Sequence, residues 1–86
     1  MKLNDKFILH ISGDETILVA TGDSDFSGIV KGNKTLGKIL ELLKDETSEE
    51  KIVSYLKDIY EGDTDVIAND VKNALAKLRE IGALDE

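Results

Sequence analysis

One long stretch near the carboxyl end, residues 65–82, has the strongest pattern in the sequence. Its apolar residues recur at the spacing of one helical face. They are Ile67, Val71, Ala74, Leu75, Leu78 and Ile81. Asp63, Thr64 and Asp65 precede the pattern as candidate caps, and Gly82 follows it as a stop signal. The pattern predicts an amphipathic helix of about five turns, which needs a partner surface against which to bury its apolar stripe.

The first third of the chain contains short apolar runs that are typical of β-strands. Residues 7–11 and 16–20 are two such runs around a glycine-containing turn, which predicts a β-hairpin. Residues 26–31 form a third run. Gly28 and Gly32 bracket this third strand, and we expect it to be short because glycine weakens strands.

The middle of the chain changes to a helical period. Two groups of apolar residues fall at helical spacing: Leu36, Ile39, Leu40 and Leu43, and then Ile52, Val53, Leu56, Ile59 and Tyr60. Asn33 is a candidate cap for the first helix, and Thr47 with Glu50 matches a capping box for the second. Gly37 costs the first helix about 1 kcal/mol relative to alanine, and we expect that it lets another element approach closely.

Three strands followed by three helices predict an α+β fold. The simplest arrangement is a three-stranded antiparallel sheet capped by the three helices. Residues 83–86 follow as a tail, and Leu84 is expected to fold back onto the core. The length of 86 residues is that of one domain, so we interpret residues 1–86 as a single domain.

Composition and charge exclude several classes of function. The chain has no cysteine, which excludes disulfides, thiolate metal sites and a cysteine nucleophile. It has neither a run of about 18 apolar residues nor a signal peptide, so we expect a soluble, cytoplasmic protein. The formal net charge is −7, from 18 acidic and 11 basic residues. Such a charge repels nucleic acid and anionic membranes, and we expect neither as a partner.

Residues that could carry catalysis are sparse. His10, the only histidine, lies in an apolar strand-like run, and we interpret it as an ordinary strand residue rather than a catalytic base. The acidic pairs Asp45–Glu46 and Glu49–Glu50 are explained more simply by their favourable interaction with a helix dipole. There is no glycine-rich loop of the kind that holds phosphate. We therefore predict a protein that is not an enzyme and needs no cofactor.

Residues 23–28 are similar to the start of a calcium-binding loop, with carboxylates at the first and third positions and glycine at the sixth. Lys34 stands at the twelfth position, where the glutamate ligand would be, so we interpret this segment as a turn without a metal. The pair Asp23–Ser24 is also similar to the phosphopantetheine attachment site of carrier proteins. In those proteins the serine begins a helix and is followed by leucine, whereas here Asp25 follows within strand-like flanks, which disfavours this alternative.

Two features remain as candidate binding surfaces. The first is the third strand, with Gly28, Ile29, Val30 and Lys31, because an edge strand can accept an added strand through its unpaired backbone groups. The second is the side of the last helix that carries Lys72, Leu75, Ala76 and Arg79. With Lys31 and Lys34 nearby, the two would form a basic, partly apolar groove. A protected edge and a solvated helix face explain the same residues without any binding role.

Motifs along nearly the whole chain share their order and spacing with a known family. The first consists of residues 33–35 and the apolar run 39–43 that follows them. The second consists of residues 47–50 with Ile52, Leu56 and Tyr60. The third begins at residues 69–71 and includes Leu75, Leu78 and residues 81–84. Together with the hairpin at 7–20, these stretches resemble the PqqD family of peptide-binding modules, also called RiPP recognition elements. No single motif is specific, and the order of all of them carries the resemblance.

The resemblance implies a winged helix-turn-helix fold and a non-catalytic peptide chaperone that binds the leader segment of a ribosomally made precursor peptide. In the family the leader adds as a strand to the third wing strand and packs against the third helix. The module then presents the leader to a modifying enzyme, commonly a radical S-adenosylmethionine (SAM) enzyme. Carried over to this chain, Leu75 and Ala76 would receive apolar leader side chains, and Lys72 and Arg79 would meet leader carboxylates. The expected state is a monomer or a weak homodimer.

Two glycines depart from the family pattern. Gly32 stands where an apolar residue is usual, and Gly37 stands where alanine is common. Both can alter how the third strand meets the first helix. The alternative function is a winged-helix DNA-binding regulator, since the order of elements is the same and fold does not decide function. A net charge of −7 without a basic run disfavours this alternative.

Overall fold

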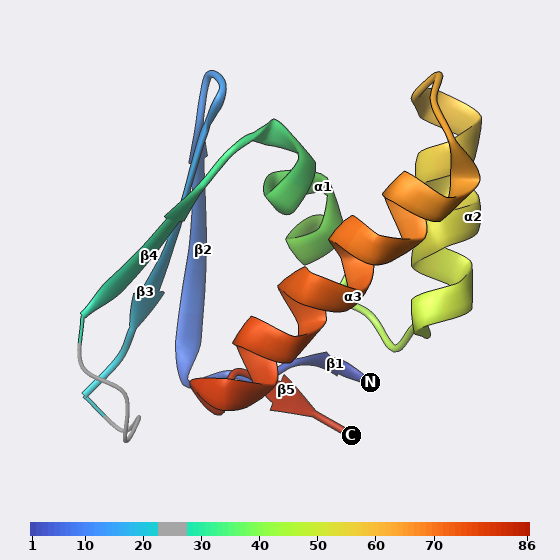
Figure 1. Ribbon diagram of the computed structural model, residues 1–86. Coiled ribbons are helices and arrows are strands. Elements are labelled where there is room, and N and C mark those ends of the chain that lie inside the picture. The colour runs from blue at the N-terminus through green and yellow to red at the C-terminus, as the bar shows by residue number, and fades with distance from the viewer. Residues whose placement is uncertain (23–27) are drawn as a thin grey trace.

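The computed structural model describes residues 1–22 and 28–86. The calcium-like segment and the Asp23–Ser24 pair fall on residues 23–27 and lie outside the described part. The elements in chain order are β1 (Lys2–Leu3), β2 (Phe7–Ser12), β3 (Glu15–Ala20), β4 (Ile29–Gly32), α1 (Lys34–Leu42), α2 (Glu49–Ile59), α3 (Thr64–Glu80) and β5 (Leu84–Asp85). Three sheet strands followed by three helices confirm the predicted α+β order (Figure 1).

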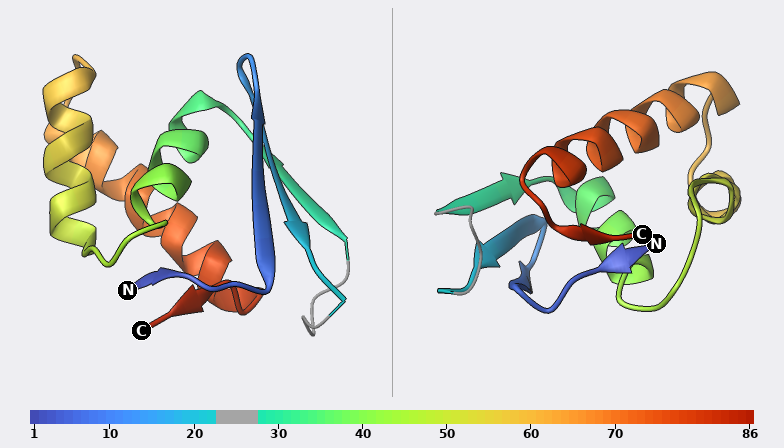
Figure 2. Two further views of the ribbon diagram at one scale, coloured as in Figure 1. Left: turned by 180° about the vertical axis from the view of Figure 1, so that it is seen from behind. Right: turned by 90° about the horizontal axis from the view of Figure 1, so that it is seen from below.

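The main sheet is antiparallel with the order β2-β3-β4, so β4 lies at an edge. Side chains alternate between its two faces. Phe7, Leu18 and Val30 point into the core. Ile8, Val19 and Ile29 form a cross-strand row on the exposed face. The helices lie on one side of this sheet, as two further views show (Figure 2), so the sheet has one packed face and one open face.

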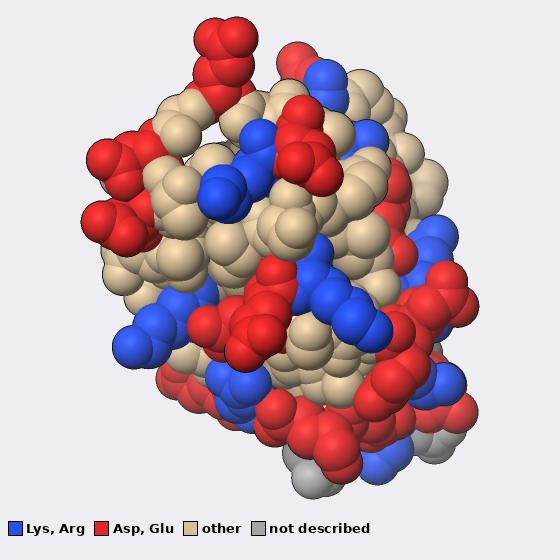
Figure 3. Space-filling view, turned by 90° about the vertical axis from the view of Figure 1, so that its right-hand side faces the viewer, with Lys and Arg blue, Asp and Glu red and all other residues tan. Residues whose placement is uncertain are grey.

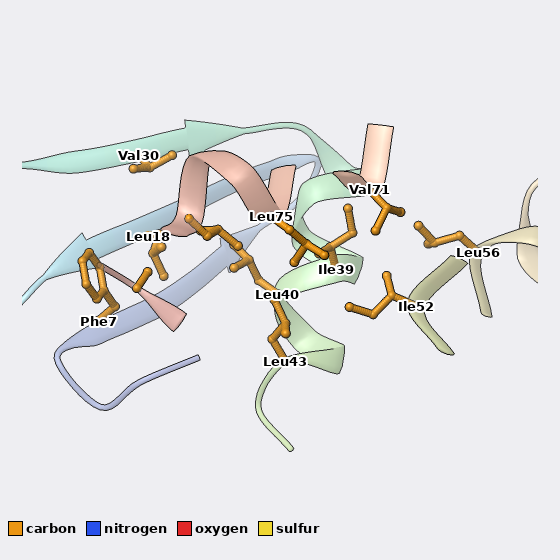
Figure 4. Packing of buried hydrophobic residues seen from close by; sticks show 12 residues of the cluster. Phe7, Leu18, Val30, Ile39, Leu40, Leu43, Ile52, Leu56, Val71 and Leu75 are labelled. Atoms are coloured by element: carbon orange, nitrogen blue, oxygen red, sulfur yellow. The ribbon is translucent and has the colours of Figure 1, made fainter. Parts of the chain in front are cut away.

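The core extends from the inner face of the sheet, at Phe7, Leu18 and Val30, through the helices to Ile52 and Leu56 of α2 (Figure 4). Val71, Leu75 and Leu78 of α3 are 0–1% exposed. Ile67, Ala74 and Ile81 pack against the same core as partly buried residues. The apolar stripe predicted for this helix is therefore confirmed. No helix in the described ranges is both long and apolar enough to cross a membrane.

Two very short strands, β1 and β5, were not predicted. They pair antiparallel, with Leu3 opposite Leu84. The backbone N–H of Leu3 also donates to the carbonyl of Leu43 over 2.7 Å, which ties this pair to the end of α1. Leu84 packs against the core. The expectation that Leu84 folds back is thus confirmed, and the tail around it is a strand.

The helix caps agree with the sequence at two of three positions. Asn33 Oδ1 accepts a hydrogen bond from the N–H of Leu36, and Asp63 Oδ1 accepts one from the N–H of Asp65. The predicted cap Thr47 is wrong, because the cap of α2 is Ser48. Backbone groups of Thr47 are instead paired with Met1, through Thr47 N–H to the Met1 carbonyl and the Met1 ammonium to the Thr47 carbonyl. The amino-terminal segment thus holds Thr47, and α2 begins one residue later than expected.

Of the run 26–31 predicted as the third strand, residues 29–31 lie in β4, which ends at Gly32, and residues 26–27 lie outside the described part. Gly28 has φ of +122°, a conformation outside the strand region that glycine adopts readily. Gly32 is the last residue of β4 and pairs with Thr16. A Cβ atom at Gly32 would collide with the side chain of Leu36. Glycine at this position therefore lets the first turn of α1 fold against the end of β4.

Gly37 allows α1 to approach β3 closely, as predicted. A Cβ atom at this position would lie 2.5 Å from Thr16 Oγ1. That hydroxyl is buried and donates to the carbonyl of Asn33 over 3.0 Å. Thr16 therefore links β3 to the start of α1, and its short side chain has little freedom to move away.

We predict that Gly37→Ala lowers the free energy of unfolding by about 1–3 kcal/mol. Overpacking typically costs about 1–3 kcal/mol, loss of the Thr16 hydrogen bond adds about 1 kcal/mol, and the better helix propensity of alanine returns about 1 kcal/mol. Urea unfolding followed by circular dichroism measures the change. In a Thr16→Ala background the same substitution should cost less, and a stabilising effect of Gly37→Ala in the wild-type background would contradict the close contact.

Candidate functional site

The free edge of β4 can be assigned residue by residue. Ala20 donates to the carbonyl of Gly28 over 3.3 Å, so these two residues form a hydrogen-bonded pair. Bonded and non-bonded pairs alternate along an antiparallel ladder. Val30 and Gly32 therefore bond to β3, whereas the N–H and C=O groups of Ile29 and Lys31 point away from it. These two residues carry the backbone groups available for pairing at the edge.

A cavity shows which flank of α3 is turned toward this edge. It has a volume of about 260 Å³ and is lined by Asn33, Thr35, Leu36, Ile39, Asp70 and Ala74. The first of these residues directly follows the last residue of β4. Asp70 and Ala74 therefore face the junction between β4 and α1. The apolar pattern alone places Ala74 in the buried stripe and does not single out Asp70, although their four-residue spacing puts them on one side of the helix.

Lys72, Ala76 and Arg79 lie on a different flank. Successive helical residues are rotated by about 100°, so Lys72 and Arg79 project nearly opposite to Asp70. Arg79 Nη2 lies 3.0 Å from Glu86 Oε1, beside β5. This hydrogen-bonded contact lowers the pKa of the Glu86 carboxyl and raises the pKa of Arg79. The structure therefore does not bring these side chains together with Asp70 at the cavity.

Leu75 belongs to the core. Its side chain is 0% exposed, between Val71 and Leu78 on the buried stripe. In this structure it offers no surface to a ligand, so the expectation that Leu75 receives apolar side chains from a peptide does not fit its position. Ala76, next in sequence, is exposed. The predicted set therefore divides into Ile29 and Lys31 at the edge, Val30 and Leu75 in the core, Gly28 just before β4, and exposed residues on the far flank of α3.

His10 lies in β2 opposite Ile17, which confirms its place in a strand. No group of three or more histidine, cysteine, aspartate or glutamate side chains in residues 1–22 and 28–86 is arranged to hold a metal ion. What these residues do present is an unpaired strand edge beside a partly apolar cavity, and this arrangement suits an extended chain.

The family model of "Coenzyme PQQ synthesis protein D (PqqD)" matches residues 8–84. The chain belongs to the PqqD family. The match runs from the second residue of β2 to the first residue of β5, so it includes both the edge strand and α3. A comparison with curated protein sequences gives no match.

Two solved structures resemble this PqqD-family chain over nearly its whole length. One is "TbiB1 in Complex with the TbiA(beta) Leader Peptide", with a TM-score of 0.77, 22% identity, and coverage of 99% of this chain and 100% of that one. The other is "Lasso peptide synthetase B1 complexed with the leader peptide", with a TM-score of 0.76, 18% identity, and coverage of 95% and 93%. At these identities the likeness concerns the fold, and it confirms the predicted winged helix-turn-helix arrangement.

We predict that Leu75→Ala lowers the free energy of unfolding by about 2–5 kcal/mol, the usual cost of truncating a fully buried leucine. The matched control is Lys72→Ala on the exposed flank of the same helix, which should change stability by less than about 0.5 kcal/mol. Chemical denaturation of both variants measures the difference. An unchanged unfolding midpoint for Leu75→Ala would show that this side chain is not part of the core.

Proposed function

We propose that this chain binds the leader segment of a ribosomally made precursor peptide and presents it to a modifying enzyme. The observation that carries the proposal is the open edge of β4, where Ile29 and Lys31 direct backbone groups outward next to the cavity at α3. Membership of the PqqD family supports it. So do the two similar structures, since each of those proteins is in complex with a leader peptide.

In this proposal the leader extends the sheet as a fourth strand. Backbone pairing with Ile29 and Lys31 holds the peptide without regard to its sequence. Alternate leader side chains then point to opposite faces of the sheet. Those on the inner face meet the cavity lined by Asp70 and Ala74, and this contact selects the leader.

The chain's own part is recognition rather than chemistry. The modifying enzyme supplies the reaction, and a radical SAM enzyme is the partner class suggested by the family resemblance. We place the complex in the cytoplasm, with the single domain 1–86 acting as a monomer or weak homodimer. Contacts of Lys72, Ala76 and Arg79 with the leader stay predictions, and any contact of Arg79 must compete with its ion pair to Glu86.

DNA binding is the less suitable alternative for this fold. The molecule carries a net charge of −7. On the face shown in Figure 3, lysine and arginine side chains are interspersed with acidic ones and form no continuous basic patch. Binding to the DNA backbone requires several phosphates to be neutralised together, and this face has no such cluster.

The proposal is tested by fluorescence anisotropy with a labelled leader peptide from the short open reading frame beside this gene. We expect saturable binding that unlabelled leader competes away and duplex DNA does not. Absence of binding at about 100 μM protein would place the binding free energy above roughly −5.5 kcal/mol and would count against leader recognition. Competition by duplex DNA would instead favour the regulator.

We predict that Lys31→Pro weakens leader binding about tenfold while the protein stays folded. Proline removes an N–H that points away from β3, and an edge strand tolerates this loss. Lys31→Ala is the matched control, because it removes the same charge but keeps the N–H. Equal affinities for the two variants in the anisotropy titration would exclude strand addition at this residue.

A further inference from the structure

A second cavity, of about 210 Å³, lies between the end of α2 and the start of α3. Part of its wall is apolar, with Leu56 and Tyr60 from the end of α2 and Ile67 from α3. The remaining wall includes three carboxylates, those of Glu61, Asp63 and Asp70. The cavity is thus lined by both apolar and acidic residues.

This cavity and the one at the β4–α1 junction share lining residues. Thr35 and Asp70 line both the cavity at the β4–α1 junction and the one at the α2–α3 junction. The first cavity begins at Asn33, directly after β4. A chain paired with β4 can therefore continue past Thr35 and Asp70 into the second cavity without leaving the surface of α3.

The charges of the residues around the second cavity indicate which kind of side chain it would accept. No lysine, arginine or histidine lines either cavity. In residues 1–22 and 28–86 the ion pairs are Met1–Glu46 and Arg79–Glu86, so none of the three carboxylates is in an ion pair there. One oxygen of Asp63 accepts a hydrogen bond from the N–H of Asp65 at the start of α3. Asp70 lies where the two cavities meet, and it is the acid best placed to receive a cation.

We propose that the leader peptide places a lysine or arginine side chain in this second cavity. The inference rests on the proposed leader binding and adds a requirement on the leader's sequence. The methylene groups of the side chain would lie against Tyr60 and Ile67, while its cation pairs with Asp70. A purely apolar side chain would fill the space without this ion pair, and Asp70, which is exposed in the free protein, would lose contact with water without gaining a partner.

The experiment is a charge scan of the leader peptide. Each lysine is replaced in turn by norleucine and each arginine by citrulline, and every peptide is titrated by anisotropy against three proteins. These are the wild type, Asp70→Asn, and Glu80→Gln as the matched control. Glu80 is exposed on the same helix and its substitution changes the net charge equally, but it lines neither cavity. Circular dichroism verifies that both variants fold.

We expect one substituted peptide to bind the wild type about tenfold more weakly than the parent leader. With Asp70→Asn the same substitution should change the affinity by less than about twofold, and with Glu80→Gln the tenfold loss should remain. Binding of the parent leader with no charge-sensitive position, or the same loss in Asp70→Asn as in Glu80→Gln, would overturn the basic subsite and leave leader recognition standing. No binding of the parent leader to the wild type would overturn both.

Discussion

Burial of the Val71, Leu75 and Leu78 side chains is the contact on which the arrangement of the site depends. These residues are 0–1% exposed and fix the rotation of α3 about its axis. Once they face the core, Asp70 and Ala74 must turn toward the β4–α1 junction, and Lys72 and Arg79 must turn away from it. A rotation of one residue, about 100°, would give the cavity a different lining. The same packing that stabilises the fold therefore also selects the residues available for recognition.

The open edge of β4 sets a limit on what backbone pairing can contribute. Ile29 and Lys31 each offer one N–H and one C=O, and hydrogen bonds of this kind contribute about 0.5–1.5 kcal/mol each. Four such bonds give about 2–6 kcal/mol, whereas a micromolar complex needs about 8 kcal/mol after the cost of ordering the peptide. Backbone pairing alone is therefore insufficient. The difference must come from side chains, and this is why cavities adjoining the strand edge matter for the proposed function.

Local patterns predicted the fold well, because the features involved depend on neighbours in sequence. The α3 stripe, the hairpin and the Asn33 cap each depend on interactions between residues that are close together in the sequence. The predictions failed where distant segments meet. Ser48 replaces Thr47 as cap because Met1 pairs with Thr47. The helical repeat likewise shows that Lys72 and Arg79 share a side of α3. It does not show that Arg79 forms an ion pair with Glu86. Which side faces β4 is decided by tertiary packing alone.

The position of the acidic residues changes the expected polarity of the site. A basic groove formed by Lys72 and Arg79 would attract leader carboxylates, whereas the two cavities that share Asp70 are lined by acidic residues and by no lysine, arginine or histidine. The net charge of −7 acts in the same direction as these carboxylates, since it favours the approach of a positively charged segment. At physiological salt such attraction is screened beyond about 8 Å, so the overall charge affects the encounter more than the bound state. In the proposed complex, selectivity would then come from an acid within contact distance of the leader, and Asp70, which lines both cavities, is placed to provide it.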